Sequence, residues 1–414
     1  MLNILINAYA VAPNWGSEQG VGWNWIVNIA RYCKCHVITE GEWRMEIESA
    51  LEELPQKENI IFYYNPVSDE VRKMCWNQGD YRFYYHYEQW QIKTLEIARQ
   101  ICKEHGIDVI HQLNMVGFRE PGFLWKIKDV PYVWGPLSGC STTNLNFFSD
   151  AGIKTRLKYQ FKNIVNNLQL RFSGKVRNAF KNAKVLITPR IDVHHKIKRI
   201  YHKETLIMPE TGIMGSCVPI ESIQRSCNDG LNILWVGRFI YTKKLDIALK
   251  TIAELKHLPK LKLHIVGFGL NNEEKHYKDL AKKLGIENLC VWHGKKDNKD
   301  VMEMMKKMDL FFFTSISEVT STVILEAIQN RLPILCHNAC GFGNVVTDDI
   351  GRKVDLVTPE LSIKHFAEHI GYFYNNKHIL ASMHTNFDEI ANGLTYESKG
   401  EVMYNIYKEI TRKR

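Results

Sequence analysis

The stretch Leu231-Asn-Ile-Leu-Trp-Val-Gly-Arg238 decides the fold of the second half of the chain. A short apolar run that ends in a glycine predicts a buried strand whose carboxyl end opens into a loop. Similar runs recur along this half, with helical patterns between them. The further runs are Leu263–Val266, Cys290–Trp292, Leu310–Phe313 and Pro333–Cys336. Because strands alternate with helices, the pattern predicts a parallel sheet with helices on both faces.

The first half shows the same alternation in a less regular form. Leu2–Asn7 is expected to be a strand, Val21–Tyr32 a helix and His36–Thr39 a second strand, which is the start of a βαβ unit. Further strands are expected at Asp108–His111, Pro131–Trp134 and Val185–Thr188. The chain is therefore predicted to be an α/β protein of two Rossmann-like domains that face a cleft. They cover 1–215 and 216–396, and a last helix, about 397–412, can pack back on the first.

Length and composition agree with two soluble domains. The chain has 414 residues, of which 45% are hydrophobic and 24% charged, and no apolar stretch approaches the roughly 20 residues of a membrane-spanning helix. The N-terminal run lacks a positive region and is interrupted by Asn3 and Asn7, so a strand is expected there and not a signal peptide. Ten cysteines without zinc-like spacing indicate reduced thiols in a cytoplasmic protein, and no metal site is expected.

Positive charge is concentrated in one segment of the chain. Residues 151–184 hold nine Lys or Arg and no Asp or Glu, which equals the formal excess of +9 for the whole chain. Apolar residues recur there at helical spacing, namely Leu157, Phe161, Ile164, Leu168 and Phe172. A basic amphipathic helix fits an anionic membrane surface, here the inner face of the plasma membrane. The alternative is a helix packed on its own domain with a solvated basic face. No nucleic-acid-binding module is recognisable, so a nucleic-acid partner is not expected.

Two cations follow the strand that opens the second half. Arg238 comes directly after Gly237, and Lys243 stands at the start of the next helical pattern. Ligands of open α/β sheets bind beyond the carboxyl ends of the strands. Arg can bind phosphate oxygens with two N–H groups and Lys adds a point charge, so the pair could stabilise a leaving nucleoside diphosphate without a metal. The alternative is a pair of surface charges, and the neighbouring Lys244 leaves open which lysine acts.

Two carboxylates follow in the segment Glu318-Val-Thr-Ser-Thr-Val-Ile-Leu-Glu326. Glu318 lies in a loop after an apolar strand, where it could meet a donor sugar. Glu326 lies in the helix that follows, where it could accept both hydroxyls of a ribose. The start of that helix would attract a phosphate through its backbone amides, and Thr320 or Ser321 can cap it. The amides belong to Thr320, Ser321 and Thr322.

These pieces together resemble a known family. Residues 231–352 are similar to the donor domain of GT-B glycosyltransferases of family GT4, the group 1 transferases. The matching pieces are Val236-Gly-Arg238 with Lys243, Ile265-Val-Gly-Phe-Gly269, Trp292-His-Gly294, Glu318-x7-Glu326 and Pro333-Ile-Leu335. The first half resembles a bacterial branch of this family associated with surface polysaccharide assembly. Its matching pieces are Gly16-Ser-Glu-Gln-Gly-Val-Gly-Trp-Asn-Trp25, Phe118-Arg-Glu-Pro-Gly-Phe-Leu-Trp125, Trp134-Gly-Pro-Leu-Ser-Gly139 and Pro209-Glu-Thr-Gly-Ile213.

The resemblance implies a retaining, metal-independent transfer from a UDP- or GDP-linked sugar to a glycan or lipid-linked oligosaccharide, with no further cofactor. Arg238 and Lys243 would bind the diphosphate, Glu326 the ribose, and Glu318 the sugar and its developing charge. Glycines of the matching pieces would line the donor site, namely Gly237, Gly267 and Gly294. The residues implied on the acceptor side of the cleft are Gly16, Ser17, Glu18, Arg119, Glu120 and Ser138. For Arg119 and Glu120 the alternative is an internal salt bridge.

The chain departs from the family pattern at two places. Many relatives have Gly-Phe-Gly after the first glutamate, whereas this chain has Val319-Thr320-Ser321, which predicts a stiffer turn. Many also carry a histidine where Gly135-Pro136 stands here. His111 ends its own strand and is a candidate replacement, although a structural histidine fits the position as well.

Two other functions fit parts of the same pattern. A sugar-nucleotide epimerase shares the two-domain plan, and it would release an altered sugar nucleotide without an acceptor. A non-catalytic scaffold that binds nucleotide sugars is the second alternative. The intact set of Arg238, Lys243, Glu318 and Glu326 argues against the scaffold.

Overall fold

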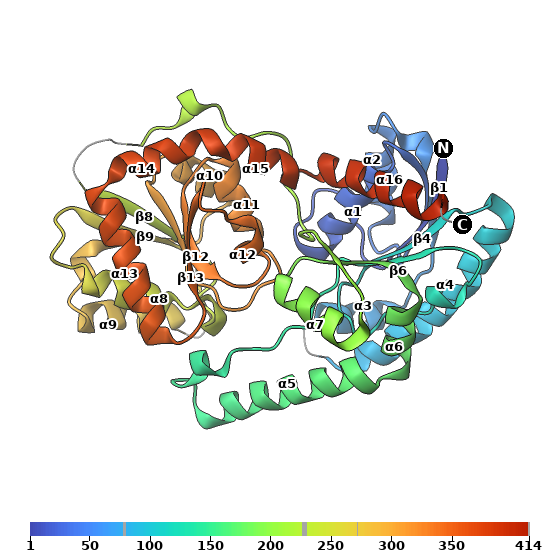
Figure 1. Ribbon diagram of the computed structural model, residues 1–414, viewed down its shortest axis with the longest axis horizontal. Helices are drawn as coiled ribbons and strands as arrows, with labels where there is room; N and C mark the ends of the chain where they lie inside the picture. Colours follow the sequence, from blue (N-terminus) through green and yellow to red (C-terminus); the bar gives the residue numbers. More distant parts are fainter. Residues whose placement is uncertain (78–79, 226–229, 271, 413–414) are drawn as a thin grey trace. The chain divides into compact units, whose positions relative to one another are not determined.

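The computed structural model describes residues 1–77, 80–225, 230–270 and 272–412, and these form two compact units (Figure 1). The first unit consists of Met1–Thr142, Phe161–Gly212 and Tyr396–Arg414, and the second of Thr143–Gln160 and Ile213–Thr395. The units therefore divide the chain differently from the expected domains 1–215 and 216–396. Residues 143–160 belong to the second unit, because Phe148 packs against Tyr241 with ring centroids 5.0 Å apart.

The first unit is built on a sheet of seven parallel strands in the order β3-β2-β1-β4-β5-β6-β7. The strands are β1 (Leu2–Ala8), β2 (Cys33–Thr39), β3 (Ile60–Tyr64), β4 (Val109–Asn114), β5 (Tyr132–Trp134), β6 (Ala183–Thr188) and β7 (Leu206–Ile207). The chain runs outward from β1 to β3 and then returns to place β4 on the other side of β1. This reversal between β1 and β4 opens a crevice at the carboxyl ends of the two strands, where α/β proteins bind ligands.

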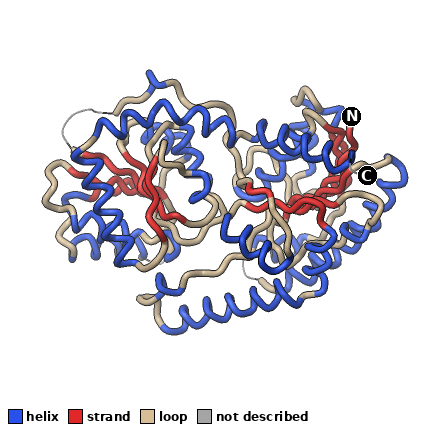
Figure 2. The backbone as a smooth tube through the Cα atoms, in the orientation of Figure 1, coloured by secondary structure: helices blue, strands red, loops and turns tan. Residues whose placement is uncertain are grey.

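Helices cover both faces of this sheet (Figure 2). Along β1, Ile4 and Ile6 pack into the core under α1 (Ser17–Ile29), whereas Leu5 points into the core on the opposite face, because side chains of a strand alternate. The first face also carries α2 (Arg44–Glu52) and α16 (Tyr396–Arg412), and the second carries α3 (Asp69–Trp76), α4 (Arg82–His105), α6 (Gly174–Asn182) and α7 (Ile191–Tyr201). The C-terminal helix α16 packs on the first unit, where Tyr404 stacks on Tyr32 with centroids 5.5 Å apart.

The second unit has six parallel strands in the order β10-β9-β8-β11-β12-β13, which confirms the expected α/β class. The strands are β8 (Leu231–Val236), β9 (Leu261–Val266), β10 (Cys290–Gly294), β11 (Leu310–Phe313), β12 (Ile334–Asn338) and β13 (Gly351–Asp355). The helices are α8 (Leu245–Glu254), α9 (Glu273–Lys283), α10 (Asn298–Met305), α11 (Thr322–Gln329), α12 (Phe342–Val345), α13 (Pro359–Asn375), α14 (Lys377–Ser382) and α15 (Phe387–Leu394). The strand order reverses between β8 and β11, so the crevice of this unit lies at their carboxyl ends.

The first part of the basic segment forms one long helix, α5 (Ile153–Phe172), as its periodicity predicts, and α6 and the start of β6 follow it. The helix does not pack through its apolar stripe: Leu157, Phe161 and Phe172 expose 58%, 68% and 69% of their surface. Its buried residues are instead Asn163, Asn166 and Leu170. The helix therefore does pack on its own domain, as the alternative interpretation expects, but through this face and not through its apolar stripe.

The described part of the chain lacks a membrane-spanning helix, a disulfide and a cluster of metal ligands. No helix there is both long and apolar enough to cross a bilayer. The nine cysteines within the described ranges are free thiols. In the same ranges, no group of three or more His, Cys, Asp or Glu side chains is arranged to hold a metal ion.

Candidate active site

The crevice of the second unit brings together the lysine and the glutamate that the sequence singles out. Lys243 ends a short 3₁₀ turn (Tyr241–Lys243) after β8, and Glu318 lies in the loop after β11. The Lys243 Nζ atom is 2.5 Å from the Glu318 Oε1 atom, and the two side chains expose only 12% and 21% of their surface. A charge pair this enclosed interacts more strongly than a surface ion pair, because water screens it less.

Hydrogen bonds between the two loops fix this pair in place. The Thr314 hydroxyl donates to the Lys243 carbonyl at 2.8 Å, and the Trp235 indole N–H donates to the Thr314 oxygen at 3.0 Å. The backbone N–H of Ile316 donates to the Thr242 carbonyl at 2.9 Å. These hydrogen bonds therefore join the loops after β8 and β11 and hold the charge pair that the loops carry.

Contacts of the neighbouring lysine settle which lysine faces the crevice. Lys244 is 1% exposed, and its Nζ atom lies 3.6 Å from Asp150, 3.7 Å from Asp246 and 4.0 Å from the ring centroid of Tyr241. It is thus directed into the body of the unit, and Lys243 is the lysine at the crevice. Arg238 is exposed, and its guanidinium makes no hydrogen bond or ion pair with any residue that the structure describes.

Three of the predicted glycines stand side by side at the ends of β8, β9 and β10. The Gly237 N–H donates to the Val266 carbonyl at 3.0 Å, and the Gly267 N–H donates to the Gly294 carbonyl at 2.9 Å. A Cβ atom on Gly267 would lie 1.9 Å from the Gly237 carbonyl oxygen. Only glycine fits at position 267, since the loops that carry the site approach each other backbone to backbone there.

Replacing Gly267 with alanine is expected to destabilise the second unit by about 3 kcal/mol, because the added methyl group overlaps a backbone oxygen that cannot move alone. Gly371→Ala is the matched control. Gly371 lies within α13, and a Cβ atom there would contact only the Leu255 side chain, at 3.8 Å. Alanine in a helix interior should stabilise by about 0.5–1 kcal/mol. Urea unfolding followed by circular dichroism measures both, and equal stability of the two variants would contradict the packing argument.

Helix α11 begins at the crevice, but its first turn differs from the expected one. Ser321 is the residue before the helix, and its side chain makes no capping hydrogen bond. Its backbone has φ +90°, a conformation that glycine adopts far more easily than serine. Thr320 is fully buried, and Thr322 is exposed at the first helical position. Of the two expected caps, Thr320 or Ser321, the residue at the cap position is Ser321, and its side chain does not cap the helix. The helix still begins at the end of the sheet where Lys243 and Glu318 lie.

Ser321→Gly is expected to stabilise the second unit by about 1 kcal/mol. The substitution removes the positive-φ strain, and this gain exceeds the cost of the greater conformational entropy that glycine gives the unfolded chain. This corresponds to a melting temperature about 2–4 °C higher for a unit of this size. Ser321→Ala keeps the Cβ atom and should bring no gain. A thermal melt in which Ser321→Ala stabilises as much as Ser321→Gly would assign the effect to the hydroxyl and not to the backbone.

The second glutamate lies in α11 and is held from a neighbouring helix. The Asn298 side-chain amide donates to the Glu326 Oε1 atom at 2.8 Å, and burial raises the pKa of the Glu326 carboxyl. Ser315 supports the first glutamate in a similar way, with its hydroxyl 3.1 Å from Glu318 Oε1. Neither Asn298 nor Ser315 was predicted as a site residue. Ser315 stands three positions before Glu318, a spacing that the sequence displays, whereas Asn298 gives no signal.

The first unit has a cavity of about 660 Å³ at the crevice side of β1. The predicted residues Gly16, Ser17 and Glu18 line it, together with Trp15 and Trp43. The Glu18 carboxylate accepts a hydrogen bond from the Val116 N–H at 2.7 Å, and burial raises its pKa. The glycine loop of the N-terminal half thus borders a real pocket within this unit.

The prediction that His111 reaches a substrate is wrong. His111 is fully buried, with Nδ1 2.6 Å from the Tyr407 hydroxyl and Nε2 2.7 Å from the Gly135 carbonyl. Burial lowers the pKa of His111 to about 4, so the ring stays neutral at physiological pH. Both ring nitrogens are used inside the unit, where His111 joins α16 to the loop after β5.

The other predicted acceptor-side residues form internal contacts of the first unit. The Arg119 guanidinium donates to the Gln169 side chain at 2.9 Å and also to Asn166, both on α5. The Glu120 carboxylate forms a salt bridge with Lys175 at 2.6 Å. The expected internal salt bridge of Glu120 therefore exists, but Lys175 is the partner and not Arg119. Ser138 is half-buried, and its backbone N–H donates to the Val116 carbonyl at 2.7 Å.

Part of the chain is similar to a known protein family. Residues 221–392 match the family model of the glycosyl transferases group 1. An uncharacterized 41.2 kDa protein in the cps region of Klebsiella pneumoniae is 26% identical over 190 residues, which is 44% of this chain and 48% of that protein. The chain spans about half or less of the length of the curated relatives it matches.

Two solved structures share the fold over nearly the whole chain. The lipopolysaccharide outer core galactosyltransferase WaaB has a TM-score of 0.62 at 14% identity, over 98% of this chain and 100% of WaaB. HepE of Anabaena, solved in complex with UDP, has a TM-score of 0.58 at 15% identity, over 99% and 100%. The chain therefore has the GT-B fold, and its residues 221–392 are a group 1 glycosyl transferase domain.

Proposed function

We propose that the protein is a retaining glycosyltransferase that moves a sugar from a UDP- or GDP-linked donor to a glycan or lipid-linked oligosaccharide. The observation that carries this proposal is the enclosed Lys243–Glu318 pair at the point where the strand order of the second unit reverses. Arg238 follows β8 and has no side-chain partner among the described residues, and α11 starts at the same edge of the sheet. A cation pair, a carboxylate and a helix start are what a nucleoside diphosphate sugar needs.

The diphosphate would lie between Arg238, Lys243 and the first amides of α11, since the positive end of a helix and two cations all favour phosphate. As the glycosidic bond breaks, negative charge grows on the leaving diphosphate. Fixed cations stabilise that charge without having to reorganise, so the proposed mechanism needs no metal ion. The diphosphate would also draw Lys243 away from its present ion pair with Glu318.

The two glutamates would act on opposite ends of the donor. Glu318, partly released from Lys243, would face the sugar ring and stabilise the positive charge that develops as the bond breaks. Glu326 would accept hydrogen bonds from the ribose hydroxyls, and Asn298 holds its carboxyl in position for this. The acceptor hydroxyl would attack on the side from which the diphosphate leaves, and a phosphate oxygen would take its proton.

The pocket of the first unit is the proposed acceptor site. Trp15, Trp43 and Trp76 cluster there with ring centroids 5.4, 5.6 and 5.9 Å apart. The Trp76 indole donates to Glu42 at 2.9 Å, and Arg72 also lines the cavity. Aromatic faces with polar groups between them suit a sugar. The similarity to WaaB and to a protein of a cps region supports an acceptor in surface polysaccharide assembly.

Thermal shift with UDP, GDP, UDP-sugars and GDP-mannose, with and without EDTA, is the first test. A nucleotide at about 100 times its dissociation constant should stabilise the protein by about 2.7 kcal/mol. A shift that survives EDTA supports the cation clamp, and a shift that EDTA removes would contradict it. Conversion of the donor into another sugar nucleotide without acceptor would instead favour the epimerase.

A further inference from the structure

We propose that α5 and the pocket between α5 and α7 form a membrane-docking surface, in which the phosphate of an anionic lipid enters the pocket and the lipid tails meet the apolar stripe of α5. This inference goes beyond the proposed transferase activity and does not depend on it. It rests on three features of the described residues: an exposed apolar stripe, a cationic pocket beside it, and the absence of acidic residues from the whole segment 151–184.

The stripe is a continuous apolar face on one helix. Ile153, Ile164 and Leu168 expose 80%, 51% and 52% of their surface, in addition to the residues named above. Soluble proteins rarely leave such a row of large apolar side chains in water unless the row binds something. The polar face of α5 is the buried one, because Asn166 and Gln169 bind Arg119. The helix is thus held with its apolar side outward.

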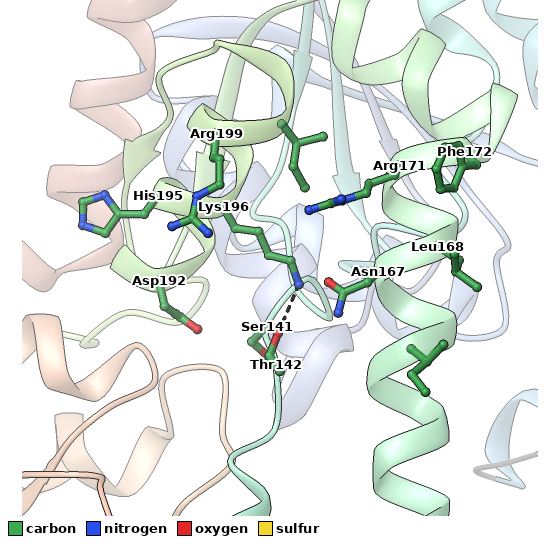
Figure 3. Close-up of a pocket in the computed structure, with 12 residues that line it drawn as sticks. Ser141, Thr142, Asn167, Leu168, Arg171, Phe172, Asp192, His195, Lys196 and Arg199 are labelled. Carbon is green, nitrogen blue, oxygen red and sulfur yellow. Dashed lines mark hydrogen bonds between the residues drawn. The ribbon is translucent and has the colours of Figure 1, made fainter.

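The pocket beside this stripe has a volume of about 700 Å³. Figure 3 shows Arg171 of α5 and Arg199 of α7 extending into it from opposite walls. Neither guanidinium makes a hydrogen bond or ion pair with another described residue, so both can bind a phosphate. Lys196 adds charge, although its ammonium already donates to Cys140 at 2.7 Å and to Thr142 at 3.2 Å.

An anionic lipid fits this pocket better than a free phosphate does. Apolar residues of the stripe, among them Ile164, Leu168 and Phe172, form part of the pocket wall itself. The one acidic wall residue, Asp192, is neutralised by Arg190, whose Nε and Nη2 atoms lie 2.8 and 2.9 Å from its carboxylate oxygens. Two arginines bind phosphate strongly, and an adjoining apolar wall suits an acyl chain.

The test is co-sedimentation of the full chain with vesicles of phosphatidylcholine, with and without phosphatidylglycerol. We expect binding that needs phosphatidylglycerol and weakens with salt. The double variant Arg171→Gln with Arg199→Gln should weaken vesicle binding about 30-fold, because each charge near the surface strengthens binding about fivefold. Leu168→Ser with Phe172→Ser should weaken it at least as strongly.

Lys282→Gln with Lys283→Gln is the matched control, because it removes two exposed charges from α9 of the second unit. This variant should bind vesicles as the wild type does, and an equal loss would mean general attraction and overturn the proposed site. Unchanged binding of either α5 pocket variant would also overturn it, as would stabilisation by inorganic phosphate without vesicle binding. The thermal shift with UDP is measured on each variant as well. It reports nucleotide binding separately, so a failure of the membrane-docking proposal is distinguished from a failure of the proposed transferase activity.

Discussion

Glu318→Gln is expected to lower the rate of sugar transfer by about 10²–10⁴-fold while UDP binds as tightly as before or more tightly. Glutamine keeps the size of the side chain and can still contact Ser315, but it cannot stabilise positive charge on the sugar. In the wild type, Glu318 also competes with the diphosphate for Lys243, because the two side chains are 2.5 Å apart. Removing the carboxylate therefore frees the lysine for phosphate.

The opposite signs of these two effects make the prediction specific. A variant that is merely misfolded would lose both transfer and UDP affinity. Glu303→Gln is the matched control, since it breaks the ion pair of the exposed Glu303 carboxylate with the half-buried Lys306 in the same unit, at 2.6 Å, and should change neither quantity. Steady-state transfer assays and UDP titration by calorimetry measure the pair. Unchanged turnover in Glu318→Gln would remove this carboxylate from the mechanism.

The sheet of the second unit could be predicted because its strands are uninterrupted apolar runs. Leu231–Val236 and Leu310–Phe313 are strands with the bounds that the sequence indicates. The edge strand Gly351–Asp355 was missed, since it contains three charged residues and only one face of an edge strand needs to be apolar. In the first unit, the aromatic stretch Arg82–Tyr87 opens α4, where Phe83, Tyr87 and Trp90 pack together at helical spacing.

Periodicity predicts a helix but not which of its faces is buried, and α5 shows this limit. The stripe of apolar residues on α5 has the spacing of a core-facing helix, yet it lies outward. The deciding contacts are polar and come from elsewhere in the fold: Arg119 and the carbonyl of Gly139 both bind Asn166. A single sequence does not show such long-range hydrogen bonds.

The same reasoning separates the site residues that could be predicted from those that could not. Lys243 and Glu318 each follow a strand, and strand order alone brings the ends of β8 and β11 together. His111 also ends near a strand terminus, but burial under Trp25 and Tyr407 turns it into a structural residue. Asn298 reaches Glu326 from the start of α10, a contact that depends on the tertiary fold.

Lys243→Met is expected to weaken UDP binding by about 10–100-fold, since it removes one charge-assisted contact to the diphosphate, worth about 1.5–3 kcal/mol. Transfer should fall further, by about 10²–10³-fold in kcat/KM, because the charge on the leaving diphosphate grows in the transition state. Lys244→Met is the neighbouring control. It should change the stability of the second unit, where Lys244 lies between Asp150 and Asp246, but not the affinity for UDP.

The double variant Lys243→Met with Glu318→Gln tests whether the two residues act as one unit. If the diphosphate takes Lys243 from Glu318 during the reaction, the loss in kcat/KM for the double variant should be well below the product of the single losses. UDP affinity should show the opposite sign of coupling: Glu318→Gln gains affinity only where Lys243 is present to be freed. Two results together would contradict this. If the losses in kcat/KM multiply, and if Glu318→Gln still raises UDP affinity in the Lys243→Met background, then the ion pair does not open on donor binding. Glu318 would then exert its effect on nucleotide affinity through the field of its charge alone.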